Sequence, residues 1–418
     1  MADINALTSP VSLTPRVRVA RTAARAAAVL ARRLRGGSGN VIGGRVLLKA
    51  APSAAAELSA GRRITLVSGT NGKTTTTGLL TAALGGDRLI GSNRGGANTS
   101  VGIAGTLAAL DNARMVLETD EGWLPWVITQ TRPVSVLISN LSRDQLSRHH
   151  EVGSVSRAWR TALDGVPLVV ANADDPAIVW AAMAADRQVW VGAHMSWTQD
   201  SLVCPSCGAR VLHEEDGWHC TGCDFRRPAL DLWLDGATLH GPDGAQVELE
   251  LGIPGRFNLG NAALAIATAH VDGVPLAEAA RRVATVPAVS GRFEQVRHGD
   301  HDLRLMLAKN PAGWLEVMVL LEPDRHPVVL CFNAEGVDGR DPSWLYDVSF
   351  TALRGRTVWV TGRRATDLLA RLAVDGVEAR RAPTGLLSVL PQLPAGRVDV
   401  VGNYTAFQST REELGLRG

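Results

Sequence analysis

The sequence lacks an uninterrupted run of about 18 apolar residues, the length that a membrane-spanning helix requires. It also lacks a secretory signal pattern, because the short apolar stretches near its N-terminus are broken by arginines. Net charge is small, +2 at pH 7, so there is no global electrostatic attraction to nucleic acid. We therefore expect a cytoplasmic protein with no nucleic-acid partner.

Cysteine is scarce, and its placement is informative. Four of the five cysteines form two CxxC pairs, Cys204 with Cys207 and Cys220 with Cys223, separated by twelve residues. Two such pairs supply four thiolates in tetrahedral geometry, which predicts a structural Zn²⁺ site with no open position for catalysis. The fifth, Cys331, lies in an apolar run and is expected to be a buried structural thiol.

Two alternatives to structural zinc follow from the same four cysteines. They could be a pair of redox dithiols, although no thioredoxin-like pattern adjoins them. A zinc ribbon could also bind nucleic acid, but the insert has only three arginines as bases, Arg210, Arg226 and Arg227. Structural zinc is the interpretation that the spacing favours.

The chain has 418 residues, which is long for one compact core, so two or three domains are expected. From residue 64 to about 291, short apolar strands alternate with helical stretches, which predicts a mostly parallel α/β sheet. A second set of strands follows and predicts a smaller α/β domain. We predict an N-terminal basic helix and linker (1–40), a central domain (41–294) with a cysteine-bearing insert (199–229), and a C-terminal domain (295–418).

Residues 16–35 are rich in Ala and Arg and predict a basic helix, with Arg18, Arg21, Arg25 and Arg32 near one face. Basic amphipathic helices bind anionic headgroups, so a peripheral position at the inner membrane face is one interpretation. The other is a solvated helix face. The second is favoured because the opposite face is mostly Ala and has no large apolar anchor.

A phosphate-binding loop follows the first predicted strand, Ile64–Ser68, and precedes a predicted helix. Backbone N–H groups of such a loop cradle phosphate oxygens at the N-terminus of a helix. Its lysine would reach the β- and γ-phosphates and its first threonine would bind Mg²⁺. The strict motif has Gly where this chain has Val67, and the alternative is a plain strand–helix turn. The candidate ATP-binding residues are Gly69, Thr70, Asn71, Gly72, Lys73, Thr74 and Thr75.

The segment 69–75 resembles the signature of the Mur ligase and folylpolyglutamate synthase family. Further segments match that family in order: Glu118 in Val-Leu-Glu-Thr-Asp-Glu, Asn140 to Gln145, Asn172 to Pro176, Gly255 to Asn261, and Gly291 to Glu294. The resemblance implies a Mur-ligase-like central P-loop ATPase domain and a Rossmann-like C-terminal domain.

The resemblance also implies roles for single residues. Glu118 and Thr74 would hold Mg²⁺, and Asn258 and Asn261 would lie near adenine, although both Asn residues could instead cap a helix. From the C-terminal domain, Arg292 and Lys309 would clamp phosphate oxygens. The alternative for these two is that they are ordinary surface cations.

Three features differ from ordinary Mur ligases. The phosphate loop begins near residue 68, without a nucleotide-sugar domain before it. Gln145 stands where the family often has a metal-binding His, and no Lys follows Asn140 in the stretch to 186 that could be carbamoylated. Ligands for a second Mg²⁺ are therefore not assigned. With the cysteine insert and the run Asp338 to Asp347, these features resemble the MurT subgroup, as do the blocks at 307–313, 362–365 and 403–406.

The MurT resemblance implies an ATP-dependent carbon–nitrogen ligase. It would amidate the D-glutamate α-carboxylate of the lipid II stem peptide to D-isoglutamine through an acyl phosphate. The resemblance also implies that ammonia would come from a GatD-type glutamine amidotransferase partner. No internal glutaminase pattern is evident in this chain. Asp347 would orient the histidine of that partner's Cys-His pair.

Two other functions stay open at this point. The chain could be a stand-alone ligase that joins an amino acid to a carboxylate, as relatives in the family do. It could also be a non-enzymatic zinc-ribbon module with a vestigial nucleotide site. The intact Gly72-Lys73-Thr74 and Glu118 argue against the second of these.

Overall fold

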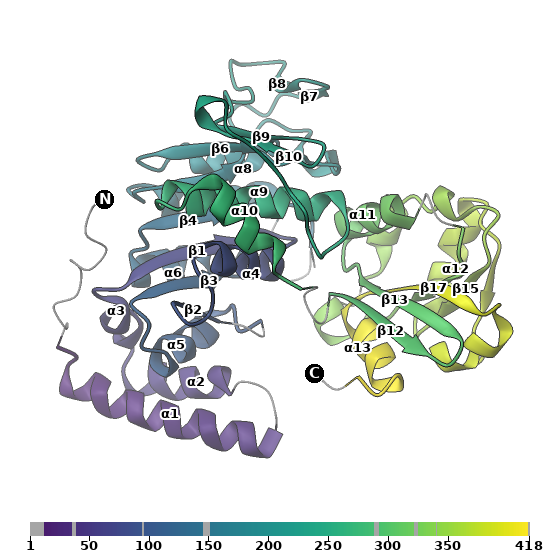
Figure 1. Ribbon diagram of the computed structural model, residues 1–418, viewed down its shortest axis with the longest axis horizontal. Coiled ribbons are helices and arrows are strands. Elements are labelled where there is room, and N and C mark those ends of the chain that lie inside the picture. Colours follow the sequence, from purple (N-terminus) through teal and green to yellow (C-terminus); the bar gives the residue numbers. More distant parts are fainter. Residues whose placement is uncertain are drawn as a thin grey trace. The chain divides into compact units, whose positions relative to one another are not determined.

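The computed structural model describes residues 12–35, 39–93, 96–144, 151–287, 292–321, 325–339 and 341–416. The chain forms two compact units (Figure 1). The first comprises residues 1–141, 151–251 and 257–286, and the second comprises 142–150, 252–256 and 287–418. No helix among the described residues combines the length and hydrophobicity needed to cross a bilayer.

A nine-stranded sheet organises the first unit, in the order β11-β10-β9-β6-β5-β4-β1-β3-β2. Neighbouring strands are parallel except for the antiparallel pairs β9–β10 and β10–β11. The predicted, mostly parallel sheet is therefore confirmed. Its strands are β1 (Arg63–Ser68), β2 (Ile90–Ser92), β3 (Arg114–Glu118), β4 (Ser135–Ile138), β5 (Val169–Asn172), β6 (Gln188–Gly192), β9 (Leu232–Asp235), β10 (Thr238–His240) and β11 (Gln246–Glu248).

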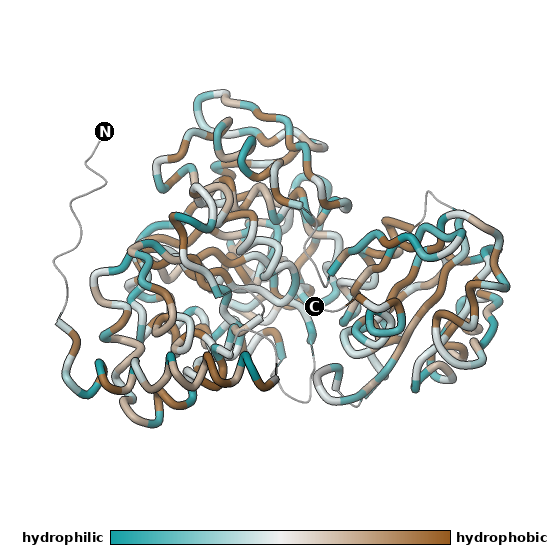
Figure 2. The backbone as a smooth tube through the Cα atoms, turned by 60° about the horizontal axis from the view of Figure 1, so that its bottom comes forward, coloured by the Kyte–Doolittle hydropathy of each residue, from teal (hydrophilic) through white to brown (hydrophobic). Residues whose placement is uncertain are grey.

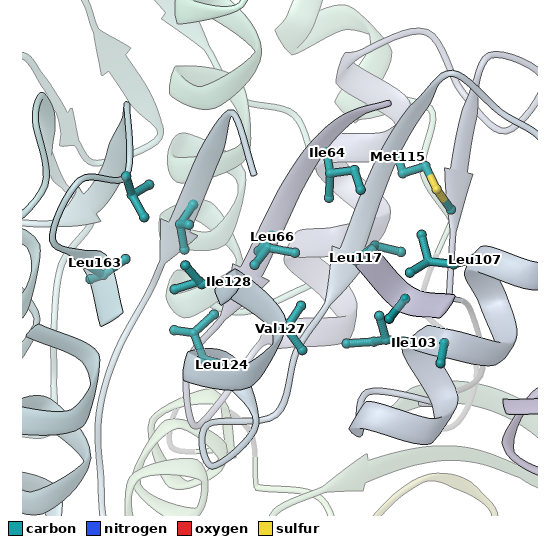
Figure 3. Close-up of a cluster of buried hydrophobic side chains, with 14 of the residues drawn as sticks. Ile64, Leu66, Ile103, Leu107, Met115, Leu117, Leu124, Val127, Ile128 and Leu163 are labelled. Atoms are coloured by element: carbon teal, nitrogen blue, oxygen red, sulfur yellow. The ribbon is translucent and has the colours of Figure 1, made fainter. Parts of the chain in front are cut away.

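Helices cover both faces of this sheet, as the burial of parallel strands requires. Alternate residues of β1 point to opposite faces, so Ile64 and Leu66 join one core and Val67 joins the other. Figure 3 shows Ile64 and Leu66 beside side chains of α5 and α6. Helices α4, α9 and α10 cover the other face. The helices are α1 (Pro15–Arg35), α2 (Asn40–Ala50), α3 (Ala54–Ser59), α4 (Lys73–Ala83), α5 (Ser100–Ala109), α6 (Leu124–Thr131), α7 (Val152–Leu163), α8 (Pro176–Ala182), α9 (Arg256–Val271) and α10 (Leu276–Ala284).

The cysteine insert carries a two-stranded antiparallel sheet, β7 (Val211–Glu214) with β8 (Gly217–Cys220). Trp218 fixes this insert to the first unit, because its indole Nε1–H donates to the Ala173 carbonyl at 2.9 Å. The same ring packs against Phe225, with ring centroids 4.9 Å apart. The insert therefore has its own small core, which also includes Val179 of α8.

The second unit is a six-stranded sheet in the order β12-β13-β17-β14-β15-β16. Only the β12–β13 pair is antiparallel. Its central strands β13, β17, β14 and β15 are mostly hydrophobic (Figure 2), whereas the edge strands β12 and β16 are more polar. Parallel strands that alternate with helices confirm the predicted α/β character, and Cys331 is buried at the end of β14 as expected. The elements are β12 (Phe293–His298), β13 (His301–Leu307), β14 (Val328–Cys331), β15 (Val358–Thr361), β16 (Ala379–Arg381), β17 (Gly396–Gly402), α11 (Pro311–Leu321), α12 (Ala365–Val374) and α13 (Tyr404–Glu413).

Candidate active site and zinc centre

The phosphate-loop candidate is a tight turn between β1 and α4 that depends on two glycines. Gly72 has φ +79°, a conformation that side chains rarely adopt, and a Cβ there would lie 2.6 Å from Asn261 Oδ1. A Cβ at Gly69 would collide with the hydroxyl of Ser139. The backbone therefore packs closely against Asn261 and Ser139 at these two glycines, and the turn places Lys73 at the first position of α4.

Asn140, which follows β4, holds the backbone of this loop in place. Its carbonyl accepts from Thr70 N at 2.9 Å, and its side-chain Oδ1 accepts from Asn71 N at 2.9 Å. Its Nδ2 donates to the Asn71 carbonyl at 3.0 Å. The next residue is also fixed, because Leu141 N donates to a carboxylate oxygen of Asp175 at 2.8 Å. The sequence identified Asn140 only as part of a family block, without this role.

Lys73 is buried within the loop, with 9% of its surface exposed. Its ammonium donates to the carbonyls of Gly69 at 2.5 Å and Thr70 at 3.1 Å, and to Glu121 Oε2 at 2.8 Å. Burial alone lowers the pKa of this lysine, but the Glu121 carboxylate and nearby acids outweigh it and raise the pKa overall. Glu121 is not among the residues that the sequence predicted for the site, and its only sequence signal is its place three residues after Glu118.

Glu118 ends β3 opposite Val67 of β1, so it lies at the same sheet edge as the loop. Its carboxylate is buried and accepts from Asn98 Nδ2 at 2.9 Å, while its backbone N–H donates to Asn93 Oδ1 at 2.7 Å. Thr74 lies in the first turn of α4. A carboxylate and a hydroxyl are the oxygen ligands that Mg²⁺ prefers. Val67 itself is a buried strand residue, so the glycine of the strict motif is not needed there.

Asn258 and Asn261 lie on one side of α9, next to the phosphate loop. Both are buried, and Asn261 Nδ2 donates to Asn258 Oδ1 at 3.3 Å. The Asn261 amide also faces Gly72, because a Cβ on that glycine would lie 2.6 Å from Asn261 Oδ1. Since α9 begins at Arg256, neither Asn occupies the position that caps the helix, and the capping alternative is wrong.

Arg292 and Lys309 belong to the second unit, at one end of the β12–β13 hairpin. The Arg292 carbonyl accepts from Leu307 N at 3.0 Å, which places the two chain segments side by side. Lys309 forms a salt bridge with Asp144, so it is not an unpaired surface cation. The prediction for Gln145 lies outside the described residues.

Asp347 ends the 3-10 helix η4 (Ser343–Asp347), and its side chain is 39% exposed. One carboxylate oxygen lies 3.3 Å from Nη1 of Arg143. The buried guanidinium of Arg371 binds the backbone of this turn, because its Nε donates to the Leu345 carbonyl at 3.0 Å. The backbone of this turn is therefore hydrogen-bonded by a buried side chain, while the Asp347 carboxylate is partly exposed and pairs with Arg143.

The four cysteines of the insert gather in one cluster, with all four Sγ atoms within 4.8 Å of one another. Sγ of Cys204 lies 3.8 Å from Sγ of Cys223, and that of Cys207 lies 3.4 Å from that of Cys220. Tetrahedral Zn–S bonds of about 2.3 Å place sulfurs about 3.8 Å apart, so the cluster fits zinc. Gly222 N also donates to Cys220 Sγ at 3.3 Å, which favours a thiolate. The cluster supports the predicted site and excludes two separate dithiols.

Two family models match the chain. The Mur ligase middle domain matches residues 67–269, and the MurT ligase C-terminal domain matches residues 307–407. The first match contains the phosphate loop, Glu118, the cysteine insert and both α9 asparagines. The second contains Lys309 and Asp347.

Two bacterial proteins that share one name are similar to this chain over most of its length. Each is a "Lipid II isoglutaminyl synthase (glutamine-hydrolyzing) subunit MurT". The protein from Staphylococcus aureus (strain N315) is 30% identical over 385 residues, covering 84% of this chain and 87% of that protein. The protein from Streptococcus pneumoniae (strain ATCC BAA-255 / R6) is 27% identical over 421 residues, covering 91% and 93%.

Solved structures show the same fold at low sequence identity. MurF from Acinetobacter baumannii gives a TM-score of 0.65 at 17% identity, covering 89% of this chain and 80% of that one. The folylpolyglutamate synthase of Mycobacterium tuberculosis, solved with ADP, gives 0.61 at 15% identity, covering 87% and 92%. These likenesses support the two-unit ligase fold.

Proposed function

This chain belongs to the Mur ligase family of ATP-dependent ligases and to its MurT subgroup, and we propose on that basis that it is the synthetase subunit of a glutamine-hydrolysing lipid II isoglutaminyl synthase. The observation that carries the ATP-dependent part is the buried Lys73 ammonium in a Gly-rich loop. The match to MurT proteins over most of the chain carries the choice of substrate.

In the proposed reaction, the α-carboxylate of the stem-peptide D-glutamate attacks the γ-phosphoryl group of ATP. An acyl phosphate forms and ADP leaves. Ammonia then attacks the carbonyl carbon, phosphate leaves, and the product is D-isoglutamine. Amide formation from a free carboxylate is unfavourable in water, and the acyl phosphate provides the leaving group that makes it possible.

Lys73 would stabilise the negative charge of the γ-phosphoryl group during transfer. The loop N–H groups at the start of α4 would hold the other phosphates. Thr74 and Glu118 would hold Mg²⁺, which would neutralise phosphate charge when bound. Asn261 would lie on the nucleotide's side of the loop, and Lys309 would add positive charge from the second unit.

The ammonia is proposed to come from a partner glutaminase. Asp347 supports this proposal because its carboxylate is partly exposed, beside Arg143, on a turn whose backbone accepts a hydrogen bond from Arg371. Such a carboxylate orients a histidine by accepting its Nδ1–H and stabilises the imidazolium that forms. Asp347 would therefore act on the partner's glutamine hydrolysis and not on the phosphoryl transfer.

The test is a lipid II amidation assay by mass spectrometry, with the glutaminase partner co-expressed and either glutamine or ammonium as nitrogen source. We expect Lys73→Ala to lose activity with both sources, by about 10²-fold or more. Asp347→Asn should lose glutamine-driven activity by up to about 10⁴-fold and keep ammonium-driven activity. Matched controls are the exposed Arg187→Ala and the partly exposed Asp367→Asn, which should behave as wild type.

Three other outcomes would contradict parts of this proposal. Normal glutamine-driven activity in Asp347→Asn would exclude the cross-subunit role. A wild-type protein that joins an amino acid to a carboxylate, and does not use ammonia, would instead support the stand-alone ligase. If wild type never amidates lipid II with either source, the substrate assignment fails.

A further inference from the structure

Helix α1 carries alanines on its inner face and aliphatic side chains on its outer face. Val17, Ala20, Ala24, Ala28 and Ala31 recur at helical spacing and are all buried. They pack toward α2 and α5, which α1 adjoins (Figure 1). The alanine-rich face is therefore the one that the protein core covers, and only the opposite face is available to a partner.

The outer face of α1 has the large apolar residues that the inner face lacks. Val19 is 72% exposed, Leu30 is 58% and Leu34 is 73%, and Val29 lies beside them at 42%. Isolated exposed aliphatics are ordinary on a protein surface. Here four of them lie on one helix of 21 residues, and Val29 and Leu30 line a shallow hollow together with Thr22, Arg25, Ala26 and Arg33.

Positive charge flanks these aliphatic residues. Arg18, Arg32 and Arg33 are exposed, and residues 15–35 contain no Asp or Glu. The neighbouring helix α2 adds the exposed Arg45 and Lys49 and also contains no acidic residue.

Two acidic side chains lie close to α1, and the structure shows how they are engaged. Asp111 forms salt bridges with Arg21 and Arg25, beside the inner face. Glu57 accepts hydrogen bonds from the backbone N–H and hydroxyl of Thr14. Both carboxylates therefore already have partners, and the described outer face of α1 keeps its positive charge.

We propose that the outer face of α1 is a docking surface for an anionic phospholipid membrane, with Val19, Val29, Leu30 and Leu34 entering the headgroup region and Arg18, Arg32 and Arg33 contacting lipid phosphates. Aliphatic side chains bordered by arginines, on a helix that does not span the bilayer, are the features that such a surface requires. A protein partner would need complementary acidic groups, whereas a membrane supplies both anionic charge and apolar depth. The inference concerns binding only and does not depend on the proposed reaction.

The test is flotation of the full-length chain with vesicles of phosphatidylcholine alone or with an equal part of phosphatidylglycerol. Wild type should float with the anionic vesicles, should not float with phosphatidylcholine alone, and should be released at high salt. Arg18→Ala/Arg33→Ala should weaken binding by about 25-fold, at about fivefold for each arginine. Val19→Glu/Leu30→Glu should abolish it.

Matched controls are Leu89→Glu and Val374→Glu, which place the same charge at similarly exposed aliphatic positions outside α1. They should bind as wild type does, and circular dichroism should show that all variants fold. The proposal fails if wild type does not float with anionic vesicles or if the α1 variants float equally well. It also fails if light scattering shows that wild type is a dimer that Val19→Glu/Leu30→Glu dissociates, since the face would then bind a second copy. Vesicle binding with no amidation activity would overturn only the proposed function.

Discussion

At the scale of single residues, lysine is the informative type in this chain. The sequence has only three lysines, at positions 49, 73 and 309, among 43 basic residues. Two of the three are the candidates for contacting ATP phosphates. An ammonium is compact and donates in several directions, which is what the Lys73 position requires between two loop carbonyls and Glu121. A planar guanidinium holds its donors in a fixed fork, which does not match three acceptors arranged around one point.

Glu121 is the counter-ion of Lys73, and its removal yields a prediction. Glu121→Gln would leave a buried ammonium without its charge partner, which should lower the free energy of unfolding by roughly 3 kcal/mol. Because nucleotide phosphates would supply the missing negative charge, ATP should raise the melting temperature of Glu121→Gln more than that of wild type. Thermal unfolding with and without Mg-ATP measures both effects.

The control for that experiment is Glu278→Gln, which removes a partly exposed i,i+4 pair with Arg282. It should change stability by less than about 1 kcal/mol and leave the nucleotide effect unaltered. An equal or smaller ATP effect in Glu121→Gln than in wild type would show that Glu121 does more than hold the lysine.

At the scale of elements, Asp175 joins helix α8 to the segment that holds the phosphate loop. One carboxylate oxygen caps α8 by accepting from Ala177 N and Ile178 N, and the other accepts from Leu141 N. Asn140, one residue earlier, bonds the loop itself. The loop geometry therefore depends on a buried carboxyl at the start of a helix on another part of the sheet.

This carboxyl gives stability a pH dependence. Burial raises the pKa of Asp175 from 3.8 to about 6, against the lowering effect of its backbone hydrogen bonds. The folded state thus binds the proton more tightly, so the contribution of Asp175 to stability is fully present below about pH 4 and is lost as the pH rises to about 6. Over this range the contribution of Asp175 to the free energy of unfolding changes by about 3 kcal/mol.

Chemical denaturation of wild type and Asp175→Asn across pH 4 to 7 measures this effect. The stability of wild type relative to the variant should fall by up to about 3 kcal/mol over that range. Asp235→Asn, at an exposed position in the same unit, should run parallel to wild type. A wild-type advantage that grows with pH would show that the carboxylate form is the one that stabilises the fold.

Elements with strong local signals could be predicted from sequence, and those defined by packing could not. The strand at 64–68 and the helix after the glycine loop could be predicted because the phosphate-loop motif lies between them. The faces of α1 could not be assigned, because an alanine face is apolar but small, and only its neighbours show that it packs closely. Those neighbours are small too: a Cβ at Gly43 of α2 would lie 2.8 Å from the Ala24 carbonyl. Glu121 was missed for a related reason, since its partner is 48 residues away in sequence.

At the scale of the whole molecule, the described residues form two units with separate hydrophobic cores. The zinc-binding candidate belongs to the first unit, through Trp218 and its bond to Ala173. Cys331 is buried in a core of the second unit. Units with their own cores are expected to unfold as separate cooperative transitions. The two kinds of cysteine therefore report on different parts of the molecule.

Cys204→Ser should remove bound zinc, measured as loss of one metal ion per chain by native mass spectrometry, because three thiolates hold it less tightly than four. In scanning calorimetry it should lower the transition of the first unit by roughly 5 °C or more, since each kcal/mol moves such a transition by about 2–4 °C. Cys331→Ser makes the same chemical change in the other core and should lower only the second transition, with zinc retained. If Cys204→Ser kept its zinc, the four cysteines would not form the metal site. If each variant moved both transitions together, metal loss and core damage would act on one cooperative molecule, and the cluster would not be a separate structural centre of the first unit.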